Sequence, residues 1–170
     1  MIPAASRWSL AAFAGLITLL VAAPISRAAL ADSGRGESRL TPAELGFRNA
    51  VAGGTGTSGV QGIETVVLSG DPNGHGLYTI MLKVPPHTRI EAHDHPDERT
   101  ATVLSGTWRF GYGDRFDERG LKDLPPGSFY TEPAGRNHFA ETGESGVVVL
   151  ITGIGPSGLH YSGLESGAVP

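Results

Sequence analysis

Between residues 63 and 152 the chain alternates short apolar runs with clusters of turn residues. Within these runs, hydrophobic and polar positions follow the two-residue period of a half-buried β-strand. There are eight such runs, at residues 63–68, 77–84, 88–93, 99–104, 107–112, 128–131, 138–141 and 147–152. The stretches between them contain no helical run long enough for a parallel crossover, so we expect antiparallel strands closed into a small barrel or jelly roll.

The segment before residue 63 carries a different pattern. Thr41-Pro42-Ala43-Glu44 has the form of a capping box with proline at the first helical position, which predicts a short N-terminal helix to about Asn49. Residues 53–59 are rich in glycine and indicate a flexible connection. Their G-x-G-x-x-G pattern has no strand before it and no helix after it, so we do not assign it to a dinucleotide site.

The first 31 residues have the order of a secretory signal peptide. Arg7 precedes an apolar run over residues 8–23, and small residues end at Ala31, where we expect cleavage. The run is shorter than the roughly twenty residues that span a membrane, which disfavours a permanent anchor. We therefore divide the chain into a signal peptide (1–31), an N-terminal helix and linker (32–61) and one β-barrel domain (62–170), located in the periplasm or secreted.

Composition narrows the choice of partners and ligands. Without residues 1–31 the chain keeps 11 basic and 17 acidic side chains, a net charge of −6, which disfavours nucleic acid and anionic membranes. It contains no cysteine, so disulfides, thiolate metal sites and thiol catalysis are excluded. Any metal must be bound through nitrogen and oxygen atoms.

Three histidines are the best candidates for such a site. His93 and His95 are two residues apart, so in an extended strand both imidazoles point to the same face. His138 can reach the same point from a later strand. Imidazole nitrogens bind divalent Fe, Mn, Zn, Ni or Cu, and three of them leave coordination positions open for water or a substrate.

The spacing around these histidines resembles that of the cupin superfamily, whose members are small jelly-roll β-barrels. The first cupin motif, G-x5-H-x-H-x3,4-E-x6-G, is matched at His93, His95 and Gly106. The second, G-x5-P-x-G-x2-H-x3-N, is matched at Gly127, Pro133, Gly135 and His138. The resemblance covers about residues 62–155 and implies one divalent transition metal bound by the three histidines.

One departure from the first motif lies at the metal. Arg99 stands where the family usually has a glutamate ligand, and Glu98 precedes it. A guanidinium has no lone pair to give to a metal. Either a β-bulge turns Glu98 inward as a fourth ligand, or the site has three histidines and Arg99 lines the pocket. Counting by twos from His93 favours the second alternative.

The planar guanidinium of an inward-facing Arg99 can donate two parallel hydrogen bonds to an oxyanion, so we expect a small anionic ligand. The alternative is that Arg99 pairs with an acidic neighbour, for which we consider Asp97, Glu98 and Glu91. Tyr130 and Phe139 flank the second motif and are candidates for ligand contacts. Glu91 is also a minor alternative metal ligand, whereas His75, His87 and His160 lack a suitable position.

These features predict an exported metal-binding cupin that accepts a small anionic ligand, with no catalytic residue assigned. Two alternatives remain open. The first is a metal-dependent enzyme with dioxygenase-like, isomerase-like or decarboxylase-like activity on a small carboxylic acid. The second is a non-catalytic binding or assembly module, since exposed barrel edges can pair between copies in a homodimer.

Overall fold

The computed structural model describes residues 37–47 and 49–162, so the predicted signal peptide lies outside the described residues. Its strands, in chain order, are β1 (Val51–Ala52), β2 (Glu64–Ser69), β3 (Gly76–Val84), β4 (Arg89–Asp94), β5 (Arg99–Ser105), β6 (Trp108–Tyr112), β7 (Lys122–Leu124), β8 (Phe129–Glu132), β9 (His138–Thr142), β10 (Val147–Gly155) and β11 (His160–Tyr161). One short 3-10 helix, η1 (Glu118–Gly120), precedes β7. In this part of the chain, no helix has the length and hydropathy needed to cross a membrane.

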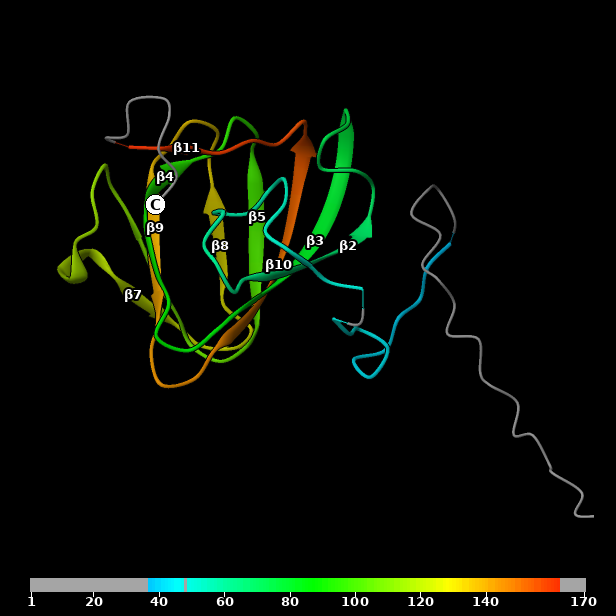
Figure 1. Cartoon of the computed structure of the whole chain (residues 1–170), viewed down its shortest axis with the longest axis horizontal. Helices are drawn as coiled ribbons and strands as arrows, with labels where there is room; N and C mark the ends of the chain where they lie inside the picture. Colours follow the sequence, from blue (N-terminus) through cyan, green and yellow to red (C-terminus); the bar gives the residue numbers. More distant parts are fainter. Residues whose placement is uncertain (1–36, 48, 163–170) are drawn as a thin grey trace, which may run out of the picture.

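The strands form two antiparallel sheets packed face to face (Figure 1). One sheet has the order β1-β2-β3-β10-β5-β8 and the other has the order β11-β4-β9-β6-β7. All eight predicted strands are present, with ends within three residues of the predicted ones. The prediction of an all-β antiparallel jelly roll is therefore confirmed. The additional strands β1, β7 and β11 are two or three residues long, too short for alternation to reveal them.

The predicted helix near Thr41 is reduced to one turn. Thr41 donates from its backbone nitrogen to Glu44 Oε2 at 2.8 Å, which is one half of a capping box, and its hydroxyl donates to the same oxygen at 2.7 Å. The chain nevertheless forms only a turn at residues 42–44, most of it exposed. A helix this short needs tertiary packing to persist, and these residues have no apolar face buried against the barrel.

The tight turn after β5 leads from one sheet to the other and does not form a hairpin. Ser105-Gly106 joins β5 to β6, but these strands lie in different sheets and do not pair. Gly106 has a φ of 74°, and a Cβ there would lie 2.1 Å from the Gly146 carbonyl oxygen. Glycine is needed because the chain passes directly against the start of β10 as it moves between sheets.

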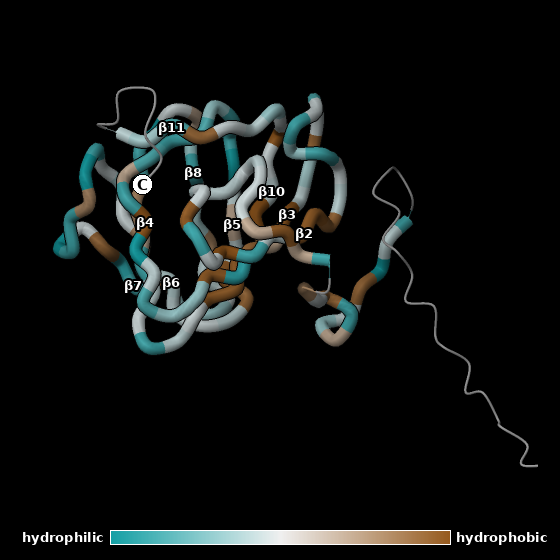
Figure 2. The backbone as a smooth tube through the Cα atoms, viewed as in Figure 1, coloured by the Kyte–Doolittle hydropathy of each residue, from teal (hydrophilic) through white to brown (hydrophobic). Residues whose placement is uncertain are grey.

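The core fills the space between the sheets. In β10, every second residue from Val147 to Ile151 is buried, as the alternating pattern predicts. Tyr78 and Ile80 of β3 pack from the neighbouring strand and have no measurable exposure. Figure 2 shows the hydrophobic stretches of β2, β3 and β10 lying together. The sheets therefore form a rigid frame around any site inside the barrel.

The glycine-rich residues before β2 fold back onto the barrel. We expected a flexible connection there, yet Gly56, Thr57 and Ser58 are buried. Figure 1 shows this segment, coloured cyan to green, looping across the strands. The division of the chain at residues 61 and 62 remains a prediction, but these three residues belong structurally to the barrel.

Candidate metal centre

The three predicted histidines meet inside the barrel. His93 on β4 and His138 on β9 are direct cross-strand partners in the five-stranded sheet. His95 follows β4, and its backbone carbonyl accepts a hydrogen bond of 2.8 Å from the Gly135 amide of the second motif. This bond ties the two sequence motifs together, although they are about forty residues apart in the chain.

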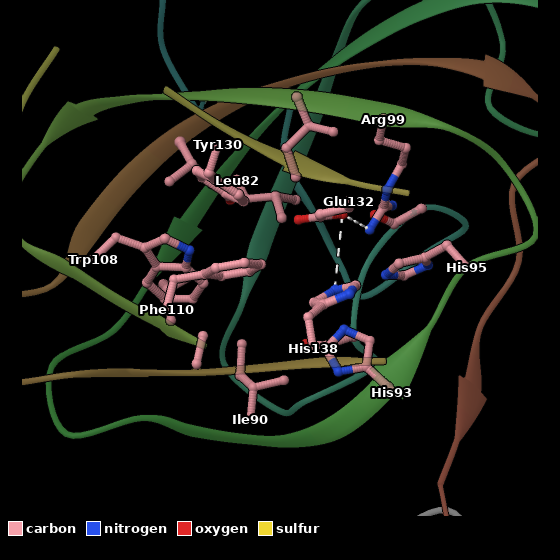
Figure 3. Close-up of a pocket in the computed structure, with 16 residues that line it drawn as sticks. Leu82, Ile90, His93, His95, Arg99, Trp108, Phe110, Tyr130, Glu132 and His138 are labelled. Carbon is pink, nitrogen blue, oxygen red and sulfur yellow. Dashed lines mark hydrogen bonds and ion pairs between the residues drawn. The ribbon is translucent and has the colours of Figure 1, made fainter. Parts of the chain in front are cut away.

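The geometry of these histidines suits a single metal ion. One ring nitrogen from each of His93, His95 and His138 lies within 4.8 Å of the others. All three residues are buried, with exposed fractions of 4, 2 and 3%. Figure 3 shows the rings gathered at one end of a cavity. Three buried imidazoles this close together are the arrangement that a metal ligand set requires.

Each imidazole is oriented by a hydrogen bond from its other nitrogen. The Nδ1 atoms bond to three backbone carbonyl oxygens: His93 to Glu91 at 2.7 Å, His95 to Gly158 at 2.5 Å and His138 to Arg136 at 3.1 Å. A carbonyl only accepts, so Nδ1 carries the proton and Nε2 keeps its lone pair. His95 Nε2 is buried and has no hydrogen-bond partner among the described residues. The orphaned nitrogen fits a metal ligand.

The protonation state also suits metal binding. Burial lowers the pKa of His93 to about 4 and that of His95 to about 2. The pKa of His138 is lowered as well, again chiefly by burial. All three imidazoles are therefore neutral at pH 7, and a metal does not have to displace a proton from them.

An ion pair faces the histidines from the opposite sheet. Arg99 on β5 and Glu132 on β8 are cross-strand partners, as His93 and His138 are in the other sheet. Arg99 Nη2 donates to Glu132 Oε2, and both residues are buried, with exposed fractions of 2 and 4%. The alternation counted from His93 correctly places Arg99 inside the barrel. It lines the same cavity as the histidines (Figure 3).

Sequence reasoning did not identify Glu132. Its Oε2 atom lies 3.8 Å from His138 Nε2, which brings a carboxylate beside the histidine cluster. Burial alone would raise the pKa of Glu132, but the Arg99 guanidinium and the nearby imidazoles outweigh it and hold that pKa well below its usual range. Glu132 has the same parity as Tyr130, so alternation along β8 contained the signal. The predicted strand ended one residue too early to use it.

Glu98, the proposed fourth ligand, lies outside the cluster. It is exposed, and its Oε2 accepts a hydrogen bond of 3.3 Å from the Ala134 amide. No bulge interrupts the pairing of β5 at residues 99–102, so alternation keeps the residue before Arg99 on the outside. The other acids considered as partners of Arg99 are also engaged elsewhere: Asp97 accepts from Tyr78 at 2.6 Å and Glu91 pairs with Arg89 at 2.7 Å.

A bulge in β4 explains why Glu91 points outward. The pairing with β9 shifts between Ile90 and His93, which lets both of these residues face the interior although they are three apart. Glu91 is exposed in consequence. Strict alternation from His93 would have placed Glu91 inside the barrel, so this minor candidate ligand fails for a local structural reason.

The two aromatic candidates have different positions. Tyr130 lines the cavity and packs against Phe110, with ring centroids 4.4 Å apart. Phe139 does not line it: its ring packs against Phe116, at 5.2 Å, and against Gly111 on the other face of the sheet. The reason is alternation, because Phe139 follows inward-facing His138 directly.

The cavity has a polar end and an apolar end. The three histidines, Arg99 and Glu132 form the first, and Figure 3 shows Trp108, Phe110 and Tyr130 gathered at the second, with Leu82 and Ile90. The volume of the cavity is about 30 Å³. A water molecule needs at least 10–15 Å³ by this measure, so the cavity has room for about two small ligand atoms or waters.

The remaining histidines lie on the surface. His75 and His87 are exposed, and His160 on β11 is exposed and lies 3.2 Å from Asp94 Oδ1. None of them belongs to the buried cluster. They serve as natural controls for experiments on the metal centre.

Comparisons with known proteins agree with this architecture. Two solved structures share the fold. The first is reported for the DMSP lyases RdDddP and RnDddQII; it has a TM-score of 0.50 and 20% sequence identity, and the match covers 59% of this chain and 52% of that one. The second is the polyketide cyclase RemF from Streptomyces resistomycificus; it has a TM-score of 0.52 and 19% sequence identity, and the match covers 61% of this chain and 73% of that one. The match thus spans about half the length of the first protein. At such identities the likeness shows the fold alone.

No curated protein matches the chain. A sequence model for the family described as the ChrR Cupin-like domain matches residues 57–157, more than half of the chain. The matched region begins within the buried glycine-rich segment and includes all three histidines, Arg99 and Glu132. The chain therefore belongs to the family of ChrR cupin-like domains, within the cupin superfamily.

Proposed function

We propose that this cupin binds one divalent transition metal through His93, His95 and His138 and uses the open side of that metal to bind a small anionic ligand. The observation that carries the proposal is the common orientation of the three imidazoles. Each Nδ1 bonds to a backbone carbonyl, which leaves Nε2 as the metal ligand. Iron, manganese, zinc, nickel and copper all accept such ligands.

The charge balance of the cavity supports an anionic ligand. The histidines are neutral, and the positive charge of Arg99 is matched by the negative charge of Glu132. A bound dication would therefore add two uncompensated positive charges in a buried space. Uncompensated charge is costly away from water, so an anion should bind in the cavity with a more favourable free energy than a neutral molecule of the same size. The Arg99 guanidinium is already engaged by Glu132 and the Gly56 carbonyl, so this argument does not use it as the anion-binding group.

Metal titration of purified protein tests the proposal. We expect wild type to bind one equivalent of Zn²⁺ or Co²⁺ by calorimetry, and His138→Ala to lose at least 100-fold in affinity because one of three ligands is removed. His160→Ala is the matched control, since that histidine is exposed and outside the cluster, and it should bind as wild type does. Equal binding by wild type and His138→Ala would refute the proposed site.

A second candidate is a metal-dependent enzyme that acts on a small carboxylic acid. The observation that favours it is Glu132, a buried carboxylate 3.8 Å from His138 Nε2 in a site that is otherwise neutral or basic. A metal in this position supplies Lewis acidity or, if it is iron, manganese or copper, a redox centre. The chain's own contribution is to hold a ligand between the histidines and the Arg99–Glu132 pair and to limit water around it. Turnover of small acids, with and without oxygen uptake, by Fe²⁺-loaded and Zn²⁺-loaded protein separates the enzyme from a binding protein.

The proposal includes export to the periplasm or medium. Its support is the order of charge, apolar run and small residues over positions 1–31. Mass spectrometry of protein isolated from a periplasmic fraction should find a chain that starts at residue 32. A full-length chain retained in the cytoplasmic fraction would contradict this part of the proposal.

A further inference from the structure

Residues 53–62, which we call the strap, run across the cavity end that holds the histidines. Five of these ten residues are glycine, and all five have positive φ values, between 72° and 107°. L-residues rarely adopt this backbone conformation, so the path of the strap depends on glycine. Thr57 and Ser58 nevertheless have exposed fractions of only 2 and 6%. The strap thus combines a hinge-like composition with a well-packed centre.

Two hydrogen bonds connect the centre of the strap to the rest of the barrel. Arg99 Nη1 donates to the Gly56 carbonyl at 2.8 Å, while the same guanidinium pairs with Glu132. Tyr161 donates from its hydroxyl to the Ser58 carbonyl at 2.5 Å, and its ring lies 5.4 Å from that of His93. The strap is therefore fastened from two sides to residues that belong to the metal centre or contact it.

The strap also forms part of the cavity wall. Gly56 and Ser58 line the cavity together with His93, His95 and His138. The Ser58 hydroxyl oxygen is buried and has no hydrogen-bond partner among the described residues. A buried hydroxyl without a partner costs free energy, so a hydroxyl left in this state in the cavity of the three histidines indicates a site for a ligand.

We propose that the strap is a lid that completes the ligand site, with the Ser58 hydroxyl as a hydrogen-bond donor to the bound anion. The inference rests on the proposed function, since the anion is the one bound beside the three histidines. The cavity, with a volume of about 30 Å³, holds only a few atoms. Metal ions and larger ligands enter when the bonds from Arg99 and Tyr161 to the strap open, and closure then brings Ser58 against the ligand.

Azide binding to Co²⁺-loaded protein, followed by visible absorption, tests the role of Ser58. We expect Ser58→Ala to weaken azide binding about fivefold to tenfold, the effect of one hydrogen bond, and to leave the Co²⁺ affinity unchanged. Thr65→Val is the control, because it removes another buried hydroxyl that has no partner among the described residues and that does not line the cavity. Equal azide affinities in wild type and Ser58→Ala would overturn the assignment.

The rate of metal exchange tests the lid. Tyr161→Phe keeps the ring beside His93 but removes the hydroxyl bond to the strap. We expect Co²⁺ uptake, and Co²⁺ release to a chelator, to accelerate by the same factor, about fivefold to tenfold, with the equilibrium affinity unchanged. Tyr112→Phe removes a comparable bond of 2.6 Å to the Thr131 carbonyl, away from the strap, and should not change either rate. Unchanged rates of Co²⁺ uptake and release in Tyr161→Phe, or equal acceleration in both variants, would contradict the proposal that the strap is a lid.

Hydrogen exchange separates failure of the lid from failure of the proposed function. In metal-free protein, the amides of residues 54–60 should exchange faster in Tyr161→Phe than in wild type, while those of β10 should not change. Wild type that fails to bind metal would refute the proposed function and leave this comparison intact. Identical exchange in the strap of both proteins would refute the lid whatever the metal result.

Discussion

The two ends of the central cavity are built from opposite kinds of side chain (Figure 3). At the apolar end, Trp108, Phe110 and Tyr130 pack between the sheets, as the core of any small β-barrel does. At the polar end, three imidazoles and an ion pair are buried almost completely. Burial of the first set stabilises the fold, whereas burial of the second lowers the histidine pKa values and leaves His95 Nε2 without a partner among the described residues.

This difference indicates which end was selected for function. Polar and titratable side chains are more stable in water, and when several of them are buried together in one cavity, the arrangement is typical of binding and catalytic sites. The surrounding strands, whose inward-facing residues are apolar, stabilise the fold enough to keep these polar side chains buried. The polar end should therefore be replaceable without loss of the fold, and the apolar end should not.

Removal of an aromatic ring from the apolar end should have the largest effect on stability. We expect Phe110→Ala to lower the free energy of unfolding by about 4 kcal/mol, because the ring is 4% exposed and its loss leaves a cavity. Urea unfolding of metal-free protein measures this effect. A loss below about 1 kcal/mol would show that the apolar end does not support the frame.

Breaking the ion pair at the polar end should have the next largest effect. Arg99→Met leaves the carboxylate of Glu132 buried without its partner, and we expect a loss of about 3 kcal/mol in the free energy of unfolding. The double variant Arg99→Met/Glu132→Leu removes both charges and should recover most of that loss. If the double variant is as unstable as the single one, the pair contributes to the fold itself and the contrast between the two ends is wrong.

Acid should weaken the fold through the histidines by a smaller amount. The folded-state pKa values of His93 and His95, about 4 and 2, lie below the unfolded value of 6.5, so the unfolded state takes up protons first as the pH falls. The associated stability is present above pH 6.5 and is lost below it. Between pH 7 and 5.5 we expect metal-free protein to lose on the order of 2 to 3 kcal/mol from these two groups together. The double variant His93→Gln/His95→Gln should show a correspondingly flatter pH profile, and an equal slope in both proteins would contradict the assignment.

The frame of the molecule was largely predictable from the sequence. Apolar alternation identified the eight main strands, and the spacing around His93, His95 and His138 identified the histidines that meet in the barrel. Counting by twos also placed Arg99 inside correctly. The strands and the inward position of Arg99 follow from local periodicity, which needs no knowledge of which strands pair, whereas His138 was joined to His93 and His95 through the resemblance to the cupin motifs.

The features that were missed depend on contacts between distant parts of the chain. Glu132 meets Arg99 because β8 pairs with β5 in a register that alternation does not define. Glu91 is turned outward by a bulge in β4, and Glu98 is kept outside by an uninterrupted β5. The strap was expected to be a flexible connection because its composition is glycine-rich, and only the fold shows that Ser58 reaches the cavity. One further aromatic, Phe139, was assigned to the wrong face although its neighbour His138 already defined the parity.

The central claim, that three imidazoles converge on one metal, is tested most directly by X-ray absorption spectroscopy of Zn²⁺-loaded protein. The account predicts three imidazole nitrogens at about 2.0–2.1 Å from the metal in wild type and two in His138→Ala loaded at high metal concentration. A spectrum with fewer than three imidazoles in wild type, or one that His138→Ala leaves unchanged, would contradict it.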